Sequence, residues 1–305
     1  MIKKTVIIGG AAGGATTAAR LRRRDEEMEI VILEKGEYIS YANCGLPYYI
    51  GGVIQSRESL LLQTPKKMED NYKIDVKTLT EVIAIDRNKR ELTVKNLKNN
   101  TIFTETYDKL VIATGSTPIR PNIPGIHNHN IFTLWNIPDT DSIKTYIANN
   151  KIKEAAIIGG GFIGLEMAEN LHSLGLKVTM IEMQNQVMAP IDFEMAQLLH
   201  ENIVNNGVNL ILNDGVTEFK HENNHTEVVL NSGNVISTDM VILSIGVRAN
   251  SLLAKEAGLI CNQRGGIVVN EYLQTSDDDI YAVGDVIEID HFISKTKTMI
   301  PLAGP

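Results

Sequence analysis

Cysteine is scarce in this sequence, because only Cys44 and Cys261 occur among its 305 residues. Two cysteines so far apart exclude a disulfide framework and favour a reducing compartment, so we expect a cytoplasmic protein. No second cysteine lies within five residues of Cys44, which excludes a redox-active disulfide between neighbouring cysteines. Any disulfide that Cys44 forms must therefore be with a substrate.

Long apolar runs and an excess of positive charge are also missing. No segment approaches the length of a membrane span, and the apolar residues before Gly9 are too few for a secretion signal. The net charge of -8 disfavours nucleic acid as a partner. We therefore expect a soluble protein that is not exported, binds neither membranes nor nucleic acid, and has no metal site.

The chain length and its first motif indicate a nucleotide-binding protein of two domains. A chain of 305 residues is longer than one hydrophobic core usually supports. Residues 5–8 predict a strand, 9–14 a glycine-rich turn, and the alanine-rich segment to Arg24 a helix, while a second strand over 30–33 ends at Glu34. This order is typical of dinucleotide binding: the turn admits the pyrophosphate and the acid binds a ribose hydroxyl. Ala11 departs from the strict glycine pattern, and a purely structural turn is the alternative.

The same pattern occurs again about 150 residues later, as in an internal repeat. A predicted strand over 156–158 leads into Gly159–Gly164, a complete G-x-G-x-x-G, and the helix after it stops at Gly175. The next strand, over 177–181, ends at Glu182. Two dinucleotide sites imply two dinucleotides, and Glu182 favours NADH over NADPH because it would repel a 2′-phosphate.

Further predicted strands complete the pattern. Residues 110–115 and 241–246 predict parallel strands that each end at a glycine, and the segments 76–108 and 208–240 predict antiparallel excursions. A short strand leads to Gly284 and Asp285 at the end of 275–285.

Residues 40–52 form a turn of small residues that we interpret as the redox centre. Pro47 suits the first turn of a helix, whose N-terminus would stabilise a thiolate at Cys44 and make it nucleophilic. The alternative is a half-buried cysteine that acts as a small hydrophobic residue.

Together these motifs resemble those of the pyridine nucleotide-disulfide oxidoreductases over essentially the whole chain. Residues 40–52 are similar to the single-cysteine branch, the coenzyme A-disulfide reductases and NAD(P)H polysulfide or persulfide reductases. The resemblance implies an α/β fold of two Rossmann-like dinucleotide-binding domains in three layers, like the FAD/NAD(P)-binding fold of glutathione reductase. It implies FAD-binding segments at 1–115 and 271–305, a connection at 116–150 and an NAD(P)-binding domain at 151–270.

The activity that the resemblance implies passes electrons from NAD(P)H through FAD to Cys44 and on to a coenzyme A disulfide, persulfide or polysulfide. NADH is the expected nucleotide, with NADPH possible. In this family Asp285 would bond the flavin ribitol, Phe162 would stack at the flavin, and Glu166 would meet the nicotinamide amide or remain an ordinary exposed glutamate. The cofactor-binding residues implied are Gly9, Gly10, Ala11, Ala12, Gly13, Gly14, Glu34, Lys35, Val82, Ala113, Thr114, Gly115, Gly159, Gly161, Phe162, Ile163, Gly164, Glu166, Glu182, Gly246, Gly284 and Asp285.

Substrate contacts are implied at Thr16, Arg20, Arg23, Ser40 and Asn43. The physical argument agrees, because arginines at positions 20, 23 and 24 share one helix face that could hold the phosphates of coenzyme A. The alternative is a solvated charged face.

Two other functions remain open. A water-forming NADH oxidase also uses one cysteine, as a sulfenic acid, whereas peroxidase relatives carry a histidine where this chain has Ala11 and Ala12. A nucleotide-binding protein without thiol turnover is suggested by the end of the chain at Pro301–Pro305, where relatives continue into a domain that forms a homodimer. We therefore expect the C-terminal dimerisation domain to be absent from this chain.

Overall fold

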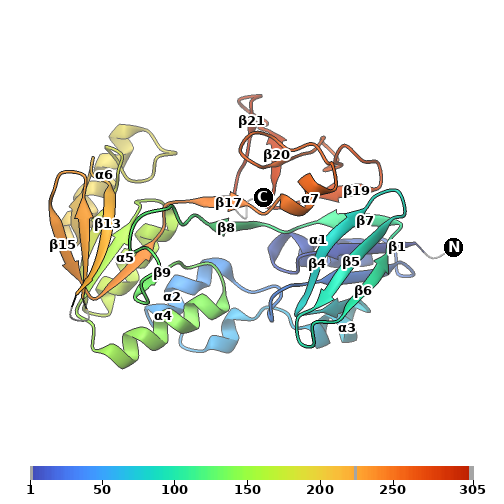
Figure 1. Cartoon of the computed structure of the whole chain (residues 1–305), viewed down its shortest axis with the longest axis horizontal. Coiled ribbons are helices and arrows are strands. Elements are labelled where there is room, and N and C mark those ends of the chain that lie inside the picture. The colour runs from blue at the N-terminus through green and yellow to red at the C-terminus, as the bar shows by residue number, and fades with distance from the viewer. Residues whose placement is uncertain (1–2, 223–224, 302–305) are drawn as a thin grey trace. The chain divides into compact units, whose positions relative to one another are not determined.

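The structure is a computed structural model that describes residues 3–222 and 225–301 (Figure 1). The chain forms two compact units. The first unit consists of Met1–Tyr41, Leu61–Thr117 and Arg248–Pro305, and the second of Ala42–Leu60 and Pro118–Val247. Of the segment Pro301–Pro305, where we expect relatives to continue into a further domain, residues 302–305 lie outside the described residues.

The first unit is built on a 5-stranded parallel sheet of order β19-β7-β1-β2-β3. Its elements are β1 (Lys4–Ile8), α1 (Ala12–Arg24), β2 (Glu29–Leu33), α3 (Pro65–Tyr72), β3 (Asp75–Lys77), β4 (Thr80–Asp86), β5 (Glu91–Asn96), β6 (Ile102–Thr106), β7 (Lys109–Ile112), α7 (Leu252–Glu256), β18 (Ile267–Val268), β19 (Ile280–Ala282), β20 (Ile287–Asp290) and β21 (Lys297–Thr298).

Alternate residues of this sheet face two different layers. Val6 and Ile8 belong to a core shared with Leu92 and Val94 of the antiparallel sheet β4-β5-β6. Ile7 belongs to a second core with side chains of α1 and α3. Strands that are buried on both faces read as continuous apolar runs, which is why 5–8 and 30–33 could be recognised in the sequence.

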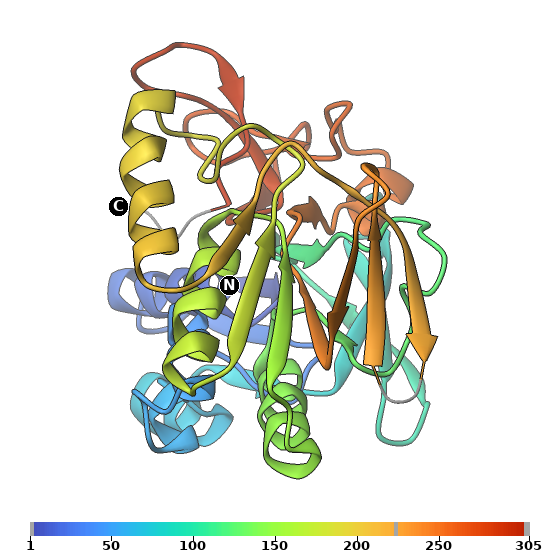
Figure 2. The same cartoon turned by 90° about the vertical axis from the view of Figure 1, so that its left-hand side faces the viewer.

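The second unit repeats this plan with a 5-stranded sheet of order β12-β11-β10-β16-β9. Its elements are η1 (Asn43–Gly45), α2 (Leu46–Ile50), η2 (Arg57–Leu60), β9 (Ile131–Phe132), α4 (Ile137–Asn150), β10 (Glu154–Ile158), α5 (Phe162–Ser173), β11 (Lys177–Ile181), α6 (Phe193–Asn205), β12 (Asn209–Ile211), β13 (Val216–Glu222), β14 (His225–Leu230), β15 (Val235–Thr238) and β16 (Met240–Leu243). Helices α5 and α6 cover one face of the parallel sheet and β13–β15 cover the other (Figure 2).

Both units therefore have the predicted fold class, a three-layer α/β arrangement of the Rossmann type. The predicted antiparallel excursions are confirmed as β4–β6 and β13–β15. The chain passes between the units in β8 (Ser116–Pro118) and β17 (Val247–Ala249), which form a two-stranded sheet. No helix of the described residues combines the length and the apolar character that crossing a bilayer requires.

The units depart from the predicted domain bounds in three places. The predicted connection contributes the edge strand β9, because Ile131 pairs with Val241 of β16. The cysteine-containing segment Ala42–Leu60 belongs to the second unit, where α2 packs against α4 and α5. Residues 248–270 belong to the first unit and not to the second.

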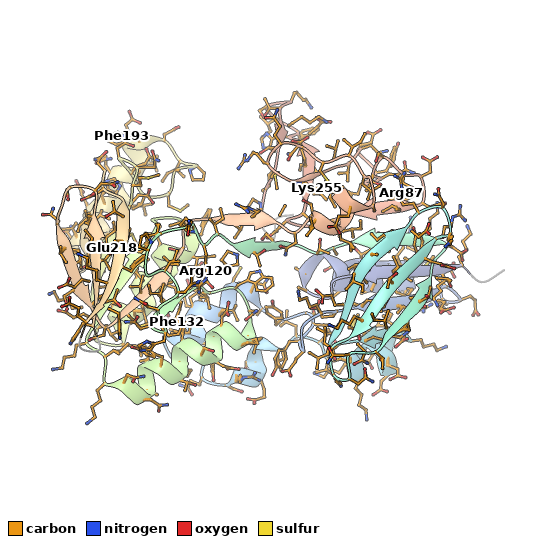
Figure 3. The ribbon with its side chains drawn as sticks, in the orientation of Figure 1. Arg87, Arg120, Phe132, Phe193, Glu218 and Lys255 are labelled. Carbon is orange, nitrogen blue, oxygen red and sulfur yellow. The ribbon has the colours of Figure 1, made fainter. Side chains whose placement is uncertain are left out.

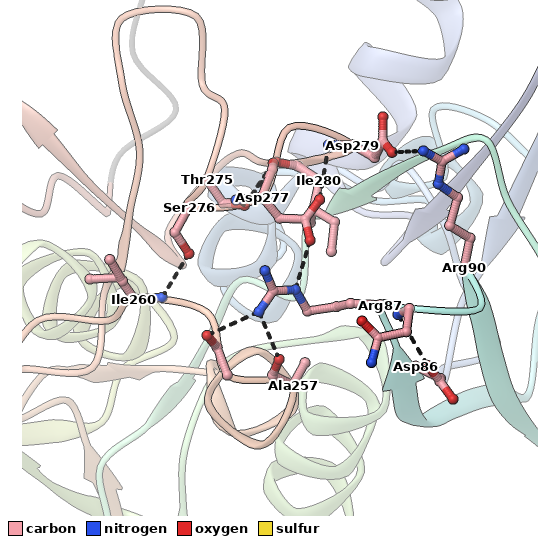
Figure 4. A network of polar contacts seen from close by, with 12 residues as sticks. Asp86, Arg87, Arg90, Ala257, Ile260, Thr275, Ser276, Asp277, Asp279 and Ile280 are labelled. Carbon is pink, nitrogen blue, oxygen red and sulfur yellow. Dashed lines mark hydrogen bonds and ion pairs between the residues drawn. The ribbon is translucent and has the colours of Figure 1, made fainter.

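Core packing and polar contacts both place residues 248–270 in the first unit, since Ala254 and Ile267 are buried in the core that contains Val6 and Ile8. Arg87 follows β4, and its Nε lies 2.7 Å from Asp277 Oδ2 just before β19 (Figures 3 and 4). The same guanidinium donates to the carbonyl oxygens of Ala257 and Gly258 at the end of α7, at 3.3 and 3.2 Å. One arginine thus joins the antiparallel sheet, α7 and the last strand of the parallel sheet.

Candidate functional site

The first glycine-rich turn joins β1 to α1. Gly9 has a φ of +100°, which L side chains rarely adopt, and a Cβ there would lie 2.3 Å from the carbonyl oxygen of Ala113. A Cβ at Gly14 would lie 1.8 Å from the carbonyl oxygen of Gly9. The helix approaches β1 this closely only because both positions lack a side chain.

Glu34 stands at the end of β2 and holds the turn. Its carboxylate accepts the backbone N–H groups of Gly10 and Gly36, both at 2.6 Å. The adjacent Lys35 forms an ion pair with Glu81 at 2.8 Å. The Val82 side chain is buried in the core between the two sheets, so only its backbone could meet a ligand.

The remaining predicted residues of the first unit lie at the carboxyl ends of β7 and β19, which are parallel neighbours in the same sheet as β1. Asp285 accepts a hydrogen bond from Ser116 Oγ at 2.8 Å. A Cβ at Gly115 or Gly284 would meet no atom within 4 Å. The structure thus gathers the residues that follow β7 and β19 at the same edge of the sheet as the first glycine-rich turn, with no protein atom near a Cβ at Gly115 or Gly284, as ligand sites in open α/β sheets require.

The second turn repeats this construction. Gly159 has a φ of +104°, and a Cβ there would lie 2.5 Å from the carbonyl oxygen of Ser244. A Cβ at Gly164 would lie 2.1 Å from the carbonyl oxygen of Gly159. Glu182 accepts the N–H groups of Gly160 at 2.7 Å and Gln184 at 2.8 Å.

The backbone N–H groups at the N-termini of the two helices after these turns, α1 and α5, are not capped by a described side chain. In the described chain neither α1 nor α5 has a side-chain cap or an acidic residue in its first turn. The free N–H groups and the positive end of the helix dipole can therefore bind a pyrophosphate. A Cβ at Gly161, which caps α5, would meet nothing within 4 Å.

The other predicted residues of the second unit surround the start of α5. Phe162 is exposed, Ile163 is half-buried, and Gly246 follows β16. Glu166 is also half-buried; burial raises its pKa above the ordinary value, and the charge of Glu169 raises it further. Glu166 is therefore a half-buried glutamate and not a fully exposed one.

Cys44 is exposed and lies in the 3₁₀ turn η1, directly before α2. Pro47 is near the start of α2, as predicted, but α2 has only five residues. The N–H groups of Gly45 and Leu46 already donate to the carbonyl oxygens of Ala42 and Asn43. The helix N-terminus therefore offers the sulfur fewer free donors than we expected.

Helix α2 packs on α5, the helix that the second glycine-rich turn begins. The contact is close: a Cβ at Gly51 would lie 2.2 Å from Asn170 Oδ1. Asn170 is 2% exposed and donates to the carbonyl oxygen of Glu166 at 2.8 Å. Within the second unit, the cysteine-containing segment is thus fixed to the proposed nucleotide-binding helix.

A cavity of about 200 Å³ lies in the first unit between α1 and α3. Three of the predicted substrate residues, Thr16, Arg23 and Ser40, line it. Arg20 does not line it, and Asn43 belongs to the second unit. The cavity is also lined by residues that the sequence did not indicate: Ala15, Ala19, Gln63, Met68 and Tyr72.

Arg22, between the predicted arginines, has a different role. Its guanidinium donates to the carbonyl oxygens of Tyr72 and Lys73 at 2.7 and 2.9 Å, and to that of Met28 at 2.7 Å. Arg22 therefore fixes α3 against α1 and so holds the two walls of the cavity. No described residue donates to the buried Oε1 of Gln63, which leaves an acceptor at the cavity wall.

A family model described as pyridine nucleotide-disulphide oxidoreductase matches residues 3–302. The chain belongs to this family. Among curated members, it is 39% identical over 278 residues to a coenzyme A disulfide reductase of Staphylococcus epidermidis, covering 91% of this chain and 62% of the relative.

Two solved structures of the family extend the comparison. The reduced Bacillus anthracis protein named CoADR-RHD is 52% identical, with a TM-score of 0.96 over 99% of this chain and 54% of its own. An NAD-dependent persulfide reductase from A. fulgidus is 35% identical, with a TM-score of 0.94 over 98% of this chain and 56% of its own. The chain thus spans less than two thirds of the length of each of these oxidoreductases.

Proposed function

We propose that this chain carries the FAD, nicotinamide and cysteine sites of an NADH-dependent reductase for small disulfides or persulfides. Coenzyme A disulfide is the first candidate substrate, because coenzyme A disulfide reductases and a persulfide reductase are among its relatives. We place the reaction in the cytoplasm, since both cysteines are free.

The first unit would hold FAD. The free N-terminus of α1 suits the pyrophosphate, Glu34 suits a ribose hydroxyl, and the space beside Gly115 and Gly284 suits the rest of the molecule. Asp285 would bind the ribitol. These residues fit the group that the family uses.

The second unit would hold NADH. Glu182 is held in place by two backbone N–H groups. Its carboxylate would therefore repel the 2′-phosphate of NADPH. Glu166 would bind the nicotinamide amide. Bound together, the two cofactors would supply a pair of electrons that can be delivered to sulfur.

Cys44 would be the nucleophile. The observation that carries this assignment is the packing of α2, which directly follows Cys44, on α5, the helix that begins at the second glycine-rich turn. In the exposed turn η1 the sulfur is open to a substrate. Its thiolate would attack a substrate sulfur to form a mixed disulfide, and no second cysteine lies within five residues of Cys44 to resolve it.

The cavity between α1 and α3 would bind the phosphate-bearing part of a substrate. Arg23 offers charge for phosphate groups, while Thr16, Ser40 and Gln63 offer hydrogen-bonding atoms. Such a site favours a nucleotide-bearing thiol over inorganic polysulfide.

Purified protein tests the proposal directly. We expect a yellow protein with a flavin spectrum that NADH bleaches, and NADH consumption that depends on coenzyme A disulfide or polysulfide. The Cys44→Ser variant should keep the flavin and its reduction by NADH but lose disulfide turnover, whereas Cys261→Ser should change neither. Protein that holds no FAD after reconstitution would contradict the proposal.

A parallel assay with oxygen separates the alternative. An NADH oxidase would consume NADH with oxygen through Cys44 and would lose that activity in Cys44→Ser. Oxygen consumption that exceeds disulfide reduction and requires Cys44 would replace our proposal with the oxidase.

A further inference from the structure

Residues 183–192 form the loop between β11 and α6, and this loop packs on the second glycine-rich turn. The backbone N–H of Met188 donates to the carbonyl oxygen of Gly160 at 2.8 Å. Val187 is fully buried, and a Cβ at Gly160 would lie 2.7 Å from its Cγ1. The turn is therefore held at two atoms of the same glycine, at its N–H by Glu182 and at its carbonyl oxygen by the loop.

A histidine of α6 holds this loop in place. His200 is half-buried, and its Nε2 accepts the backbone N–H of Val187 at 3.1 Å. A backbone N–H can only donate, so Nε2 carries no proton and the proton of the neutral ring lies on Nδ1. Protonation of the ring places a second N–H at Nε2 and removes the acceptor. The hydrogen bond of Val187 to this side chain therefore requires neutral His200.

No ion pair of the described chain involves His200, because the one histidine that forms such a pair is His225, with Asp239. Strand β12, on which α6 packs, has no ionisable residue. The end of α5 contributes His172, which lies beside Gly207 after the end of α6. The ionisable side chains nearest to His200 along the chain are all acidic: Glu182, Asp192, Glu194 and Glu201. Protonation of His200 thus breaks the contact with the loop without breaking an ion pair.

The first unit holds its own glycine-rich turn in the same way but without a histidine. The backbone N–H of Ser40 donates to the carbonyl oxygen of Gly10 at 2.9 Å, and a Cβ at Gly10 would lie 2.6 Å from Ile39 Cγ2. The one histidine in the sequence of this unit, His291, contacts Ser294 between β20 and β21. Only the second turn is therefore connected to a histidine through the loop that packs on it.

We propose that neutral His200 positions the second glycine-rich turn for a dinucleotide, and that protonation of His200 lowers the affinity for that dinucleotide. His200 acts through the loop: it holds the N–H of Val187, and the next residue holds the carbonyl oxygen of Gly160. His200 is thus a positioning residue, and the uptake of electrons from NADH weakens in acid. This inference rests on the proposed binding of NADH by the second unit.

Calorimetric titration of the FAD-loaded protein with NAD⁺ at about pH 7.5 and about pH 5.5 tests the inference on both sides of the ordinary titration range of histidine. His200→Gln keeps a side-chain acceptor that cannot be protonated in this range. We expect the parent protein to lose affinity about fivefold at the lower pH, the effect of one hydrogen bond, and His200→Gln to lose less than about twofold. Burial raises the pKa of Glu166, which can also gain a proton in acid, so the difference between the parent and the variant carries the test.

His221→Gln is the matched control. His221 is exposed on β13, on the opposite face of the parallel sheet from α6, so this variant should keep the pH dependence of the parent protein. FAD retention should be the same in all three proteins, because the first turn has no histidine contact of this kind. Equal pH dependence of NAD⁺ binding in the parent protein and in His200→Gln would overturn the inference.

A second variant serves if His200→Gln does not fold. His200→Leu removes the acceptor at every pH, so we expect it to bind NAD⁺ about fivefold more weakly than the parent protein at about pH 7.5. Affinity equal to that of the parent protein would overturn the inference. The proposed function is tested separately: folded parent protein that binds no NAD⁺ at neutral pH contradicts the nucleotide site itself, whereas binding that is independent of His200 contradicts this inference alone.

Discussion

Both units contain a glycine-rich turn that joins a strand to a helix, and they differ in the segments that pack on that helix. In both, a glutamate at the end of the second strand accepts the N–H of the second residue of the turn, at 2.6 Å for Glu34 and 2.7 Å for Glu182. The parallel sheets have matching orders, β19-β7-β1-β2-β3 and β9-β16-β10-β11-β12. The turn and the acid thus belong to the shared scaffold.

The differences lie on the helices. Helix α1 ends in Arg22, Arg23 and Arg24 and forms one wall of the cavity with α3, whereas the last turn of α5 has only His172 as a basic residue. Helix α5 is instead covered by α2, which follows Cys44. The comparison teaches that two units with one Rossmann-like scaffold differ in the segments packed on their helices.

Alanine at the closest glycine of each turn should have the largest effects. The Cβ of Gly14→Ala would lie 1.8 Å from the carbonyl oxygen of Gly9, and that of Gly164→Ala 2.1 Å from that of Gly159. We expect each to cost about 1–3 kcal/mol of unfolding free energy and to deform one turn only. Gly14→Ala should lose FAD, measured by absorbance after gel filtration. Gly164→Ala should keep FAD and lose reduction by NADH; loss of both cofactors in either variant would contradict separate sites.

The two glutamates that hold the glycine-rich turns, Glu34 and Glu182, provide the second test. We expect Glu182→Ala to narrow the preference for NADH over NADPH by about 1–2 kcal/mol, because a hydrogen-bonding charge that repels the 2′-phosphate is removed. Glu34→Ala should weaken FAD retention and leave the preference unchanged. The measurement is kcat/KM for both nucleotides, and an equal ratio in Glu182→Ala and the parent protein would exclude this role.

The arginines at the end of α1 test the difference between the helices. Arg23→Ala should raise the KM for coenzyme A disulfide about fivefold, as for a partly exposed charged contact, and Arg20→Ala should raise it less because Arg20 does not line the cavity. Neither should change the KM for polysulfide, which has no phosphate groups. Arg24→Ala is the control. Equal effects on the KM of both substrates would mean that these arginines form a solvated charged face and do not bind the phosphates of coenzyme A.

The smallest expected effect concerns the one glycine position of the G-x-G-x-x-G pattern at which the turns differ, Ala11 against Gly161. A Cβ at Gly161 meets no protein atom within 4 Å, so Gly161→Ala should change the unfolding free energy by less than about 0.5 kcal/mol. The dissociation constant for NADH should nevertheless rise, because the methyl group would approach the pyrophosphate. Ala11→Gly should tighten FAD slightly. An NADH affinity unaffected by Gly161→Ala would show that the pyrophosphate lies elsewhere.

Local patterns explain what could be predicted from the sequence. The turns at Gly9 and Gly159, the strands before them and the acids after them follow from residue types at short spacing, and the structure has them where expected. The continuous apolar strands were recognisable because both faces of each sheet are covered.

Long-range packing explains what could not. Strand β9 joins the parallel sheet through only two residues. Residues 248–270 join the first unit through buried core side chains such as Ala254 and Ile267 and through the contacts of Arg87. Gln63 and Tyr72 reach the cavity because Arg22 fixes α3 against α1, and no local spacing indicates that arrangement. The arginine cluster was recognisable as a group, but only the structure separates the anchoring Arg22 from the cavity-lining Arg23.

The most direct test of the account is mass spectrometry of the protein after incubation with coenzyme A disulfide. We predict one coenzyme A in mixed disulfide with Cys44, none on Cys261, and loss of the adduct when NADH is added to the FAD-loaded protein. An adduct that forms on Cys44 but resists NADH, or the absence of any adduct on Cys44, would contradict electron transfer from NADH to this cysteine.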